Sequence, residues 1–208
     1  MEIFPSLHLP HSKTPRVIVG VCGLRGSGKT TLANALCKRA MESDSQISDS
    51  QISGVGSKVL NFADPLKAGI KPLFLFSDEQ LHGSLKEAVD ERWGISPRHA
   101  MQRLATEFLR DTIDKDFFIK HLLCRITDPN CNYVIADVRF KNEQEALKKA
   151  GAIIVHLNRI GLDTDEHSSE KSIDPTFVDI ELENNGSCEE LCNQCIVRLE
   201  EFIGRKFA

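Results

Sequence analysis

The sequence predicts an α/β protein built on a doubly wound, mostly parallel sheet of about five strands with helices on both faces. Two observations lead to this class. Short apolar runs rich in β-branched residues alternate with stretches of helical periodicity, and the first run enters a glycine-rich turn that opens a helix. Strands and helices that alternate in this way form a parallel sheet with right-handed crossovers.

The strands are predicted from apolar runs that stop at turn residues or at a polar residue. In chain order they span residues 17–21, 58–62, 133–136, 152–157 and 177–182. The third run ends at Asp137, and the last one ends before an Asn-Asn-Gly turn.

The helices are predicted from caps and periodicity. Ser96 and Pro97 form an N-cap and first-turn pair, and the apolar residues that follow repeat at three and four positions, which predicts a buried helix. Those apolar residues are Met101, Leu104, Ala105, Phe108 and Leu109. The other predicted helices span residues 31–41, 116–126, 142–150 and 187–203, the last beginning with a capping box between Ser187 and Glu190.

Composition limits the kind of protein. A chain of 208 residues is long enough for one domain with its own core, and a net charge of −4 with interspersed signs argues against a nucleic-acid surface. We expect no membrane span and no signal peptide, because no long apolar run is present and residues 1–15 lack a basic segment followed by an apolar core.

The seven cysteines are an odd number without the spacing of a secreted disulfide framework, which favours a reducing compartment such as the cytoplasm. Cys192 and Cys195 form a C-x-x-C pair that could indicate zinc or redox chemistry. Because Cys188 precedes them at helical spacing, packing of one helix face is the preferred interpretation.

The strongest chemical signal is the sequence G-L-R-G-S-G-K-T, which matches the phosphate-binding loop G-x-x-x-x-G-K-[ST] at every fixed position. Glycines permit the tight turn, and main-chain N–H groups then converge on a phosphate at a helix N-terminus. Lys29 is placed to neutralise the β- and γ-phosphates, and the Thr30 hydroxyl to ligate Mg²⁺. The predicted nucleotide-binding residues are Gly23, Arg25, Gly26, Ser27, Gly28, Lys29, Thr30 and Thr31.

A second signal follows the third predicted strand. In a doubly wound sheet, Asp137 would lie beside the loop after the first strand, where it could hold a water molecule of the Mg²⁺ shell. Arg139 could stabilise charge on a transferring phosphoryl group. The alternative for Arg139 is a surface arginine that pairs with Glu143.

A third signal lies on the helix that Ser96 caps. Arg98 and Gln102 are one turn apart on one face, which Thr106 continues. Arginine can bind a phosphate with two parallel hydrogen bonds, and an amide can pair with a nucleobase edge. The pair would therefore suit a nucleoside monophosphate, although an ordinary solvated helix face is an open alternative.

These blocks together resemble the deoxynucleoside monophosphate kinases of tailed phages and large DNA viruses. The resemblance runs from about Val17 to the last helix, and its blocks include F-A-D-P-L-K, L-K-E, S-P-R-H-A-M-Q-R-L-A-T-E, D-K-D-F-F, I-A-D-V-R-F-K-N-E, H-S-S-E and L-E-N-N-G-S. The middle blocks are more particular to this group than the phosphate-binding loop. The sequence departs from the family pattern at Ala105 and Phe118, which leaves the base preference open.

The resemblance implies a single P-loop kinase domain over residues 16–208. It would follow a flexible tail at 1–15 and contain a substrate-binding helical region at about 64–128 and a lid at about 159–175. Residues 42–57 are Ser-rich with almost no large apolar side chains, which separately predicts a flexible surface loop. The implied acceptor residues are Asp64, Lys67, Lys86, Arg98, Gln102, Thr106, Phe118 and Arg139. The implied lid residues are Arg159, His167 and Glu170.

The expected activity is transfer of the γ-phosphoryl group of ATP, with Mg²⁺, to a deoxynucleoside monophosphate. Lys29, Asp137 and Arg139 would be the catalytic residues, and Thr30 and Asp137 the metal ligands. We expect small-molecule nucleotides as partners, no nucleic acid or membrane, and cytoplasmic action, in the host cytoplasm if the protein is viral. A homodimer is an open alternative to a monomer.

Two other functions stay open at this stage. A weaker resemblance to animal phosphomevalonate kinases rests on a similar loop, a P-L-K block and a late Asn-x-Gly turn. The other alternative is a P-loop switch that hydrolyses nucleotide slowly to control a partner. The sequence contains no N-K-x-D motif, which argues against a GTPase.

Overall fold

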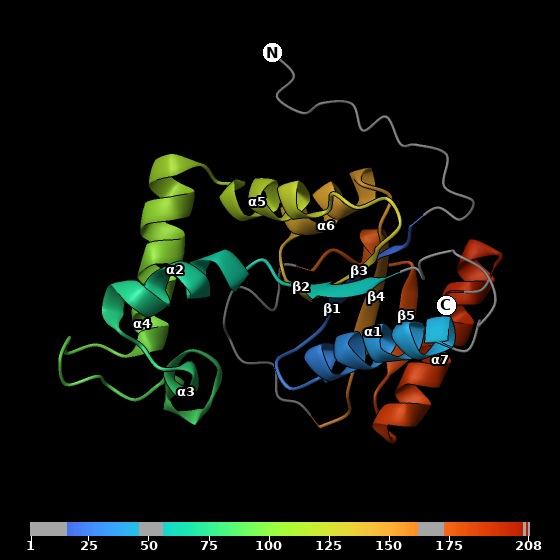
Figure 1. The fold of residues 1–208 in the computed structure, drawn as a ribbon, viewed down its shortest axis with the longest axis horizontal. Helices are drawn as coiled ribbons and strands as arrows, with labels where there is room; N and C mark the ends of the chain where they lie inside the picture. Colours follow the sequence, from blue (N-terminus) through green and yellow to red (C-terminus); the bar gives the residue numbers. More distant parts are fainter. Residues whose placement is uncertain (1–15, 46–55, 162–172, 206, 208) are drawn as a thin grey trace, which may run out of the picture. The chain divides into compact units, whose positions relative to one another are not determined.

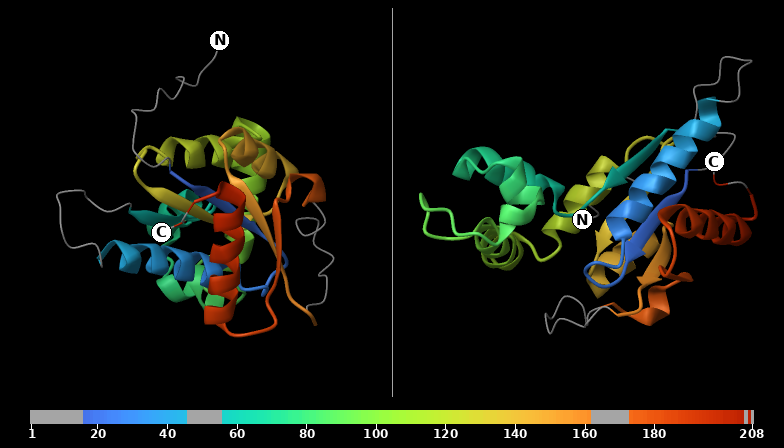
Figure 2. Two further views of the ribbon diagram at one scale, coloured as in Figure 1. Left: turned by 90° about the vertical axis from the view of Figure 1, so that its right-hand side faces the viewer. Right: turned by 90° about the horizontal axis from the view of Figure 1, so that it is seen from below.

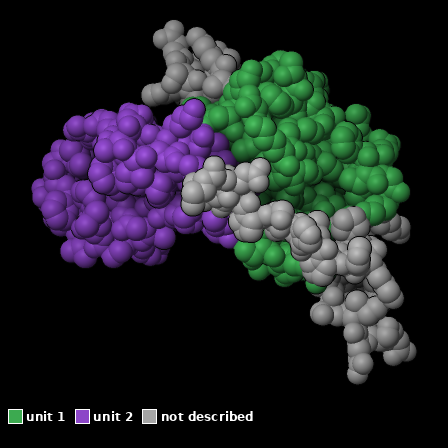
Figure 3. All heavy atoms as spheres, turned by 90° about the horizontal axis from the view of Figure 1, so that it is seen from above, with its two compact units in different colours: residues 1–60, 126–208 green, residues 61–125 purple. Residues whose placement is uncertain are grey.

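The computed structural model describes residues 16–45, 56–161, 173–205 and 207, with only the backbone described for 43–45. The chain forms two compact units, which are drawn in different colours in Figure 3. Unit 1 combines the residues up to 60 with 126–208, and unit 2 spans 61–125. The sequence-based division into a tail, one kinase domain and a lid stays a prediction.

Unit 1 contains a five-stranded, fully parallel sheet in the order β2-β3-β1-β4-β5 (Figure 1). Its strands are β1 (Ile18–Cys22), β2 (Ser57–Leu60), β3 (Asn132–Val138), β4 (Ile153–Asn158) and β5 (Ile180–Glu183). The predicted fold class is confirmed. The strand order places β1 between β3 and β4, so the loop after β1 has a strand end on either side.

Helices cover both faces of this sheet. Figure 2 shows α1 (Lys29–Ser45) beside α7 (Cys188–Ile203), and the two helices are packed together. Their apolar side chains join those of the strands in one core cluster. On the opposite face, α6 (Lys141–Lys149) approaches β1 closely at Gly20, where an added Cβ would lie 3.1 Å from the Leu147 side chain.

All seven cysteines are free. Cys192 and Cys195 are buried in the core between α7, α1 and the sheet, as the helix-face interpretation predicts. Cys188, the first residue of α7, is exposed and does not take part in this packing.

Local caps explain several boundaries. The Ser187 hydroxyl accepts a hydrogen bond from the Glu190 N–H at 3.2 Å, and the Glu190 carboxylate accepts one from the Ser187 N–H at 2.8 Å. This reciprocal pair is the predicted capping box, and α7 then ends at Gly204, whose φ is +66°.

Three predicted boundaries are wrong. Helix α1 continues to Ser45 and β2 begins at Ser57, so the predicted loop over 42–57 is too long at both ends. The rest of that loop, 46–55, lies outside the described residues. The predicted strand 177–182 begins only at Ile180, because Pro175–Phe177 forms a 3-10 helix capped by the Asp174 side chain.

Unit 2 is helical. It contains α2 (Asp64–Phe74), α3 (Asp78–His82), the 3-10 helix η1 (Ser84–Lys86), α4 (Pro97–Arg103), the π-helix η2 (Leu104–Ile113) and α5 (Phe117–Arg125). As predicted, Ser96 caps α4: its hydroxyl accepts from the His99 N–H at 3.2 Å, and Pro97 occupies the first helical position.

The change from α4 to the π-helix η2 makes the predicted apolar stripe wrong. A π-helix closes its hydrogen bonds from residue i to i+5, so the three-and-four spacing no longer holds one face toward the core. Met101, in the α-helical part, is buried at 8% exposure, whereas Phe108 in η2 is 51% exposed. The helix is therefore buried only in its first part.

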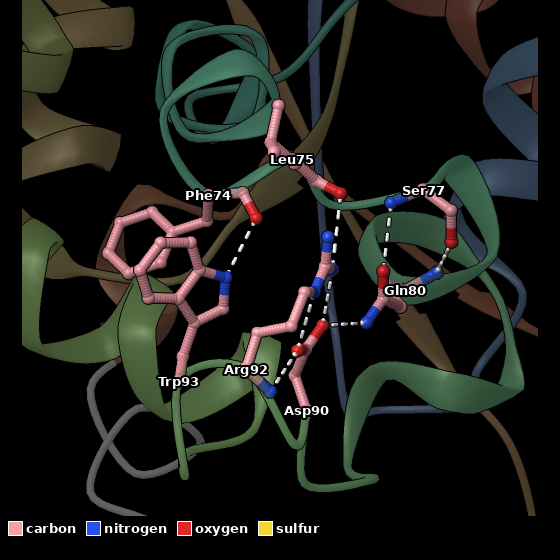
Figure 4. A network of polar contacts seen from close by, with 7 residues as sticks. All are labelled: Phe74, Leu75, Ser77, Gln80, Asp90, Arg92 and Trp93. Carbon is pink, nitrogen blue, oxygen red and sulfur yellow. Dashed lines mark hydrogen bonds and ion pairs between the residues drawn. The ribbon is translucent and has the colours of Figure 1, made fainter.

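A network around Asp90 orders the segments that precede α4 (Figure 4). The Asp90 carboxylate accepts hydrogen bonds from Arg92 Nη2 at 2.6 Å and from Gln80 Nε2 at 2.7 Å. Arg92 also donates to the carbonyl oxygen of Leu75, and the Trp93 indole donates to that of Phe74. The hydrogen bonds that Asp90 accepts, the one from the Arg92 side chain above all and then the one from Gln80, hold the pKa of Asp90 well below its ordinary value of 3.8.

We predict that Asp90→Asn lowers the melting temperature, because the amide places a donor against Arg92 and Gln80. A carboxyl with a lowered pKa in the folded state stabilises the protein above the unfolded pKa and loses that contribution as pH falls. The difference in melting temperature between the parent and Asp90→Asn should thus persist at about pH 5 to 7 and shrink below about pH 4, as the Asp90 carboxyl becomes protonated. Glu91→Gln, which removes the same charge from an exposed neighbour, is the control. A gap that does not change with pH would contradict the assignment.

Candidate functional site

The loop after β1 has the backbone that its sequence predicts. Gly23, Gly26 and Gly28 have φ values of +141°, +82° and +99°. A turn closes between the Ser27 N–H and the Leu24 carbonyl at 3.2 Å, and the Leu32 N–H then bonds to the Gly28 carbonyl at 2.9 Å as α1 begins. The loop therefore ends at a helix N-terminus, where main-chain N–H groups and the helix dipole favour an anion.

Gly23 passes very close to the neighbouring strand. A Cβ atom built on Gly23 would lie 2.3 Å from the main-chain oxygen of Leu157 in β4. Real Cβ atoms do not approach a carbonyl oxygen this closely, and φ of +141° is in any case accessible mainly to glycine. The path of the loop thus requires glycine here for two independent reasons.

Lys29 lies over the loop. Its ammonium group donates to the carbonyl oxygens of Gly23 at 2.8 Å and Leu24 at 2.6 Å. The positive charge is therefore held at the mouth of the turn. Thr30 and Thr31 are exposed on the first turn of α1, and Arg25 is exposed at the tip of the loop.

Cys22 stands immediately before the loop, but burial raises the pKa of its thiol to about 12. Its sulfur donates to the Val155 carbonyl at 3.5 Å. A protonated, buried thiol is a poor nucleophile. The chemistry of this site therefore has to come from the loop and its neighbours.

The sheet brings Asp137 to the loop. Strands β1 and β3 are parallel and adjacent, with Cys22 opposite Val138 after a register shift. Asp137 is thus beside the residue that begins the turn, and its side chain is partly exposed. The ends of β1 and β3 therefore lie side by side, as predicted. The metal-binding role of Asp137 stays a prediction.

Arg139 follows β3 and is exposed. The main-chain N–H groups of Arg139 and Phe140 donate to the Glu143 carboxylate at 2.9 and 3.1 Å. Glu143 is 2% exposed, so it fixes the backbone that presents Arg139 at the start of α6. This contact differs from the surface ion pair considered as an alternative for the Arg139 guanidinium.

The predicted lid is described only at its beginning. Arg159, directly after β4, donates from Nη1 to the Gly26 carbonyl at 3.3 Å and so contacts the phosphate-binding loop. His167 and Glu170 lie outside the described residues.

In unit 2, Asp64 has a local structural role. Its carboxylate accepts from the Asn61 N–H at 2.9 Å and the Asn61 amide at 3.0 Å, and it pairs with Arg125 at 3.2 Å. Asn61 and Arg125 are the first and last residues of unit 2. Asp64 therefore fastens the two ends of this unit together.

Lys67 contacts a residue that the sequence analysis did not select. Its ammonium lies 3.4 Å from Nδ1 of His82, and because lysine has no acceptor, Nδ1 must be the accepting atom. Burial, then the charges of Lys67 and Lys86, lower the pKa of His82. Both predicted acceptor lysines thus act electrostatically on one imidazole.

Arg98 is held by a carboxylate. Its Nε donates to Glu87, the last residue of the L-K-E block, and the Arg98 side chain is 30% exposed. Gln102 is exposed one turn further along α4. Arg98 and Gln102 therefore share an α-helical face, as predicted.

Two predicted acceptor residues remain. Thr106 lies in the π-helix and Phe118 is buried. Thr106 is exposed in the π-helix η2, so it does not continue the face of Arg98 and Gln102 at α-helical spacing. Phe118 is 4% exposed, with the Arg110 guanidinium 5.2 Å from its ring centre. Their contacts with a substrate stay predictions.

The sequence analysis also missed Asn184. Its side-chain amide donates to the Ser27 carbonyl at 2.8 Å, which joins the turn after β5 to the phosphate-binding loop. Asn184, His82 and Glu87 all lie in or beside the sequence blocks quoted above. Their roles depend on contacts with residues far away or on another element, which helical and strand periodicity do not reveal.

A glycine-rich turn joining the central strand of a parallel sheet to a helix, with a lysine over the turn, defines the class of P-loop nucleotide-binding proteins. The chain also matches the model of the family described as Deoxynucleotide monophosphate kinase over residues 58–195. It therefore belongs to the deoxynucleotide monophosphate kinase family and is a phosphotransferase. The matched region begins after the phosphate-binding loop, so the loop is separate support for the class.

Two viral relatives agree with this family. A protein of Acanthamoeba polyphaga mimivirus, named provisionally for the same activity, is 36% identical over 197 residues, which cover 86% of this chain and 94% of the relative. The deoxynucleotide monophosphate kinase of Escherichia phage RB69 is 28% identical over 140 residues, covering 64% of this chain and 55% of the relative. The alignment thus spans about half of the phage protein.

Among solved structures, a gluconokinase from Sinorhizobium meliloti 1021 aligns with a TM-score of 0.50 over 90% of this chain and 93% of that one, at 12% identity. This likeness supports the fold alone. No helix in the described part of the chain has the length and apolar character needed to cross a membrane.

We predict that Gly23→Ala weakens ADP binding by about 5- to 150-fold, the equivalent of 1 to 3 kcal/mol of backbone strain. The new methyl group would meet the Leu157 oxygen, and the loop would have to move. Gly69→Ala is the control, since no atom lies within 4 Å of a Cβ added there and alanine is favoured within a helix. Titration calorimetry with ADP makes the measurement. Parental affinity in Gly23→Ala would contradict the role given to this turn.

Proposed function

We propose that the protein transfers the γ-phosphoryl group of ATP to the 5′-phosphate of a deoxynucleoside monophosphate, giving ADP and a deoxynucleoside diphosphate. The observation that carries this proposal is a complete phosphate-binding loop between β1 and α1 in a chain of the deoxynucleotide monophosphate kinase family. The name of the mimivirus relative supports the same acceptor class. ATP is the donor that kinase activity implies.

The donor would bind through the loop backbone. Gly23, Gly26 and Gly28 allow the turn its positive φ values. Lys29 would exchange its two carbonyl partners for β- and γ-phosphate oxygens. Arg25, Ser27, Thr30 and Thr31 complete the predicted donor site.

Magnesium would be held by few protein ligands. No group of three His, Cys, Asp or Glu residues able to hold a metal occurs among the described residues. This suits Mg²⁺, which in such sites keeps several waters and takes one or two protein oxygens together with the phosphates. The exposed Thr30 hydroxyl and the Asp137 carboxylate beside the loop would provide oxygen ligands of that kind.

The acceptor would bind to unit 2. Arg98 would exchange the Glu87 carboxylate for the substrate phosphate, and Gln102 would pair with a base edge. In unit 2, Lys67 and Lys86 would add positive charge, and Asp64, Thr106 and Phe118 are the further predicted contacts. Arg139, in unit 1, is the remaining predicted acceptor residue. Ala105 and Phe118 depart from the family pattern, so the preferred base is left to experiment.

The mechanism requires no protein nucleophile, because the acceptor is already a phosphate oxygen. Lys29 would neutralise charge on the transferring group, and Arg139 would bridge donor and acceptor phosphates. Alignment of the two phosphates and exclusion of water supply the rest of the rate. Arg159, His167 and Glu170 would form a lid over ATP, and the cytoplasm, with its nucleotides and reducing conditions, is the proposed place of action.

Lys29→Ala should lower kcat by about 10² to 10³ or more, because one preorganised charge is lost from the transition state. Melting curves establish that the variant is folded, and steady-state rates with saturating substrates give kcat. Lys38→Ala removes an exposed lysine from the same helix and serves as the control. A folded Lys29→Ala protein that turns over at the parental rate would refute the proposed mechanism.

Asp137→Asn should raise the apparent Mg²⁺ requirement, since it keeps the size of the side chain but removes a charge from the metal shell. The loss of rate should be larger at low Mg²⁺ and partly recovered as Mg²⁺ rises. Titration of the variant, the parent and Asp128→Asn with Mg²⁺ makes the comparison. An unchanged requirement would mean that Asp137 is structural.

Arg98→Ala and Gln102→Leu should fail in different ways. Arg98→Ala removes a phosphate contact common to all acceptors and should lower kcat/KM by about 10- to 150-fold for every monophosphate. Gln102→Leu should lower kcat/KM most for the best monophosphate and least for the poorest, so that the differences in kcat/KM among the monophosphates become smaller. Arg103→Ala, an exposed arginine on the same helix, is the control. Uniform effects of Gln102→Leu, or none from Arg98→Ala, would exclude α4 as the acceptor site.

A further inference from the structure

The turn that follows β5 is hydrogen-bonded to the phosphate-binding loop. The side-chain amide of Asn184 donates to the Ser27 carbonyl at 2.8 Å, across 157 residues of sequence. The main-chain N–H of Asn184 donates separately to the Asn158 carbonyl at 2.7 Å, which continues the pairing of β4 and β5. The side chain and the main chain of Asn184 therefore have different partners, one in the loop and one in the sheet.

The position of this amide bears on the anion site because a peptide group is planar and trans. The Ser27 carbonyl and the Gly28 N–H belong to the same peptide and point in opposite directions. When Asn184 holds the carbonyl, the Gly28 N–H is fixed so that it points away from Asn184. N–H groups of this loop are the ones that bind a phosphate in the P-loop motif.

The packing at Gly28 agrees with a specific fit. A Cβ added to Gly28 would lie 2.6 Å from the Asn184 amide nitrogen, so the glycine leaves the space that the amide fills. Ser27 is fully buried at 0% exposure, and the hydrogen bond from the Asn184 amide to its carbonyl is partly buried, so water competes less for this contact than at an exposed position. A hydrogen bond in such a place orders the loop more effectively than one at an exposed position.

We propose that Asn184 is a positioning residue that holds the Ser27–Gly28 peptide in the orientation that binds the phosphates of the nucleotide donor. The inference rests on the proposed function, because it concerns the same donor site. It assigns to the Asn-Asn-Gly turn a role in donor affinity, separate from the acceptor site on α4. Loss of the amide should therefore weaken donor binding and leave acceptor binding nearly unchanged.

The test uses isosteric changes in one turn. Asn184→Asp keeps the size and removes the donor, and Asn185→Asp adds the same charge at the next residue, whose side chain bonds to Glu183 and to the Ile160 N–H instead. Asn184→Ala removes the amide without adding charge. Titration calorimetry with ADP measures the affinity of the donor site without turnover. Melting curves of the nucleotide-free protein show whether each variant is folded. Steady-state rates give KM for the acceptor.

The proposal predicts ADP binding about 10-fold weaker in Asn184→Ala and weaker still in Asn184→Asp, in line with the loss of one partly buried hydrogen bond and of loop order. Both variants should melt cooperatively and keep an acceptor KM within about twofold of the parent, a negligible energy on this scale. Asn185→Asp should bind ADP nearly as the parent does. If Asn184→Ala fails to fold, Asn184→Asp compared with Asn185→Asp decides.

Three results would overturn the inference: parental ADP affinity in both Asn184 variants, equal weakening in Asn184→Asp and Asn185→Asp, or equal losses for ADP and for the acceptor. Failure of the proposed function would be recognised differently. In that case the parent itself would form no product with any monophosphate, while its ADP affinity could still be compared with that of the variants.

Discussion

The phosphate-binding loop depends on one close approach, that of the Gly23 backbone to the Leu157 oxygen of β4. An added Cβ would lie 2.3 Å from that oxygen, so the chain leaves β1 along a path that only glycine can follow. The approach exists because β4 is the parallel neighbour of β1. The same strand order places the end of β3, with Asp137, on the other side of the turn. One sheet topology thus assembles the anion site and the residue proposed to assist its metal.

Much of unit 1 could be predicted from the sequence because its signals are local. Buried parallel strands are continuous apolar runs, and the Ser187 capping box marks the start of α7 unambiguously. The same local rules failed where the backbone left standard geometry. Phe108 follows the α-helical period in sequence, yet the π-helix exposes it, and Pro175 turns the start of a predicted strand into a 3-10 helix.

In the candidate site, too, some residues could be predicted from the sequence and others could not. The loop is contiguous in sequence, so its residue types and spacing reveal its chemistry directly. Asp137 required one further step, the rule that parallel strands end at a common edge. The contacts of Asn184 with Ser27, of Glu87 with Arg98 and of His82 with Lys67 join different elements. No periodicity encodes such pairs, and the tertiary structure was needed to find them.

The chemical identity of the phosphoryl acceptor decides what this protein does, and a single assay can establish it. ADP release from ATP can be followed by a coupled assay over the deoxynucleoside and ribonucleoside monophosphates, with phosphomevalonate and an acceptor-free reaction beside them. The account predicts that at least one deoxynucleoside monophosphate raises ADP release well above the acceptor-free rate, with an equal amount of the diphosphate formed. The account would be contradicted if no monophosphate raised the rate, or if phosphomevalonate were the best acceptor.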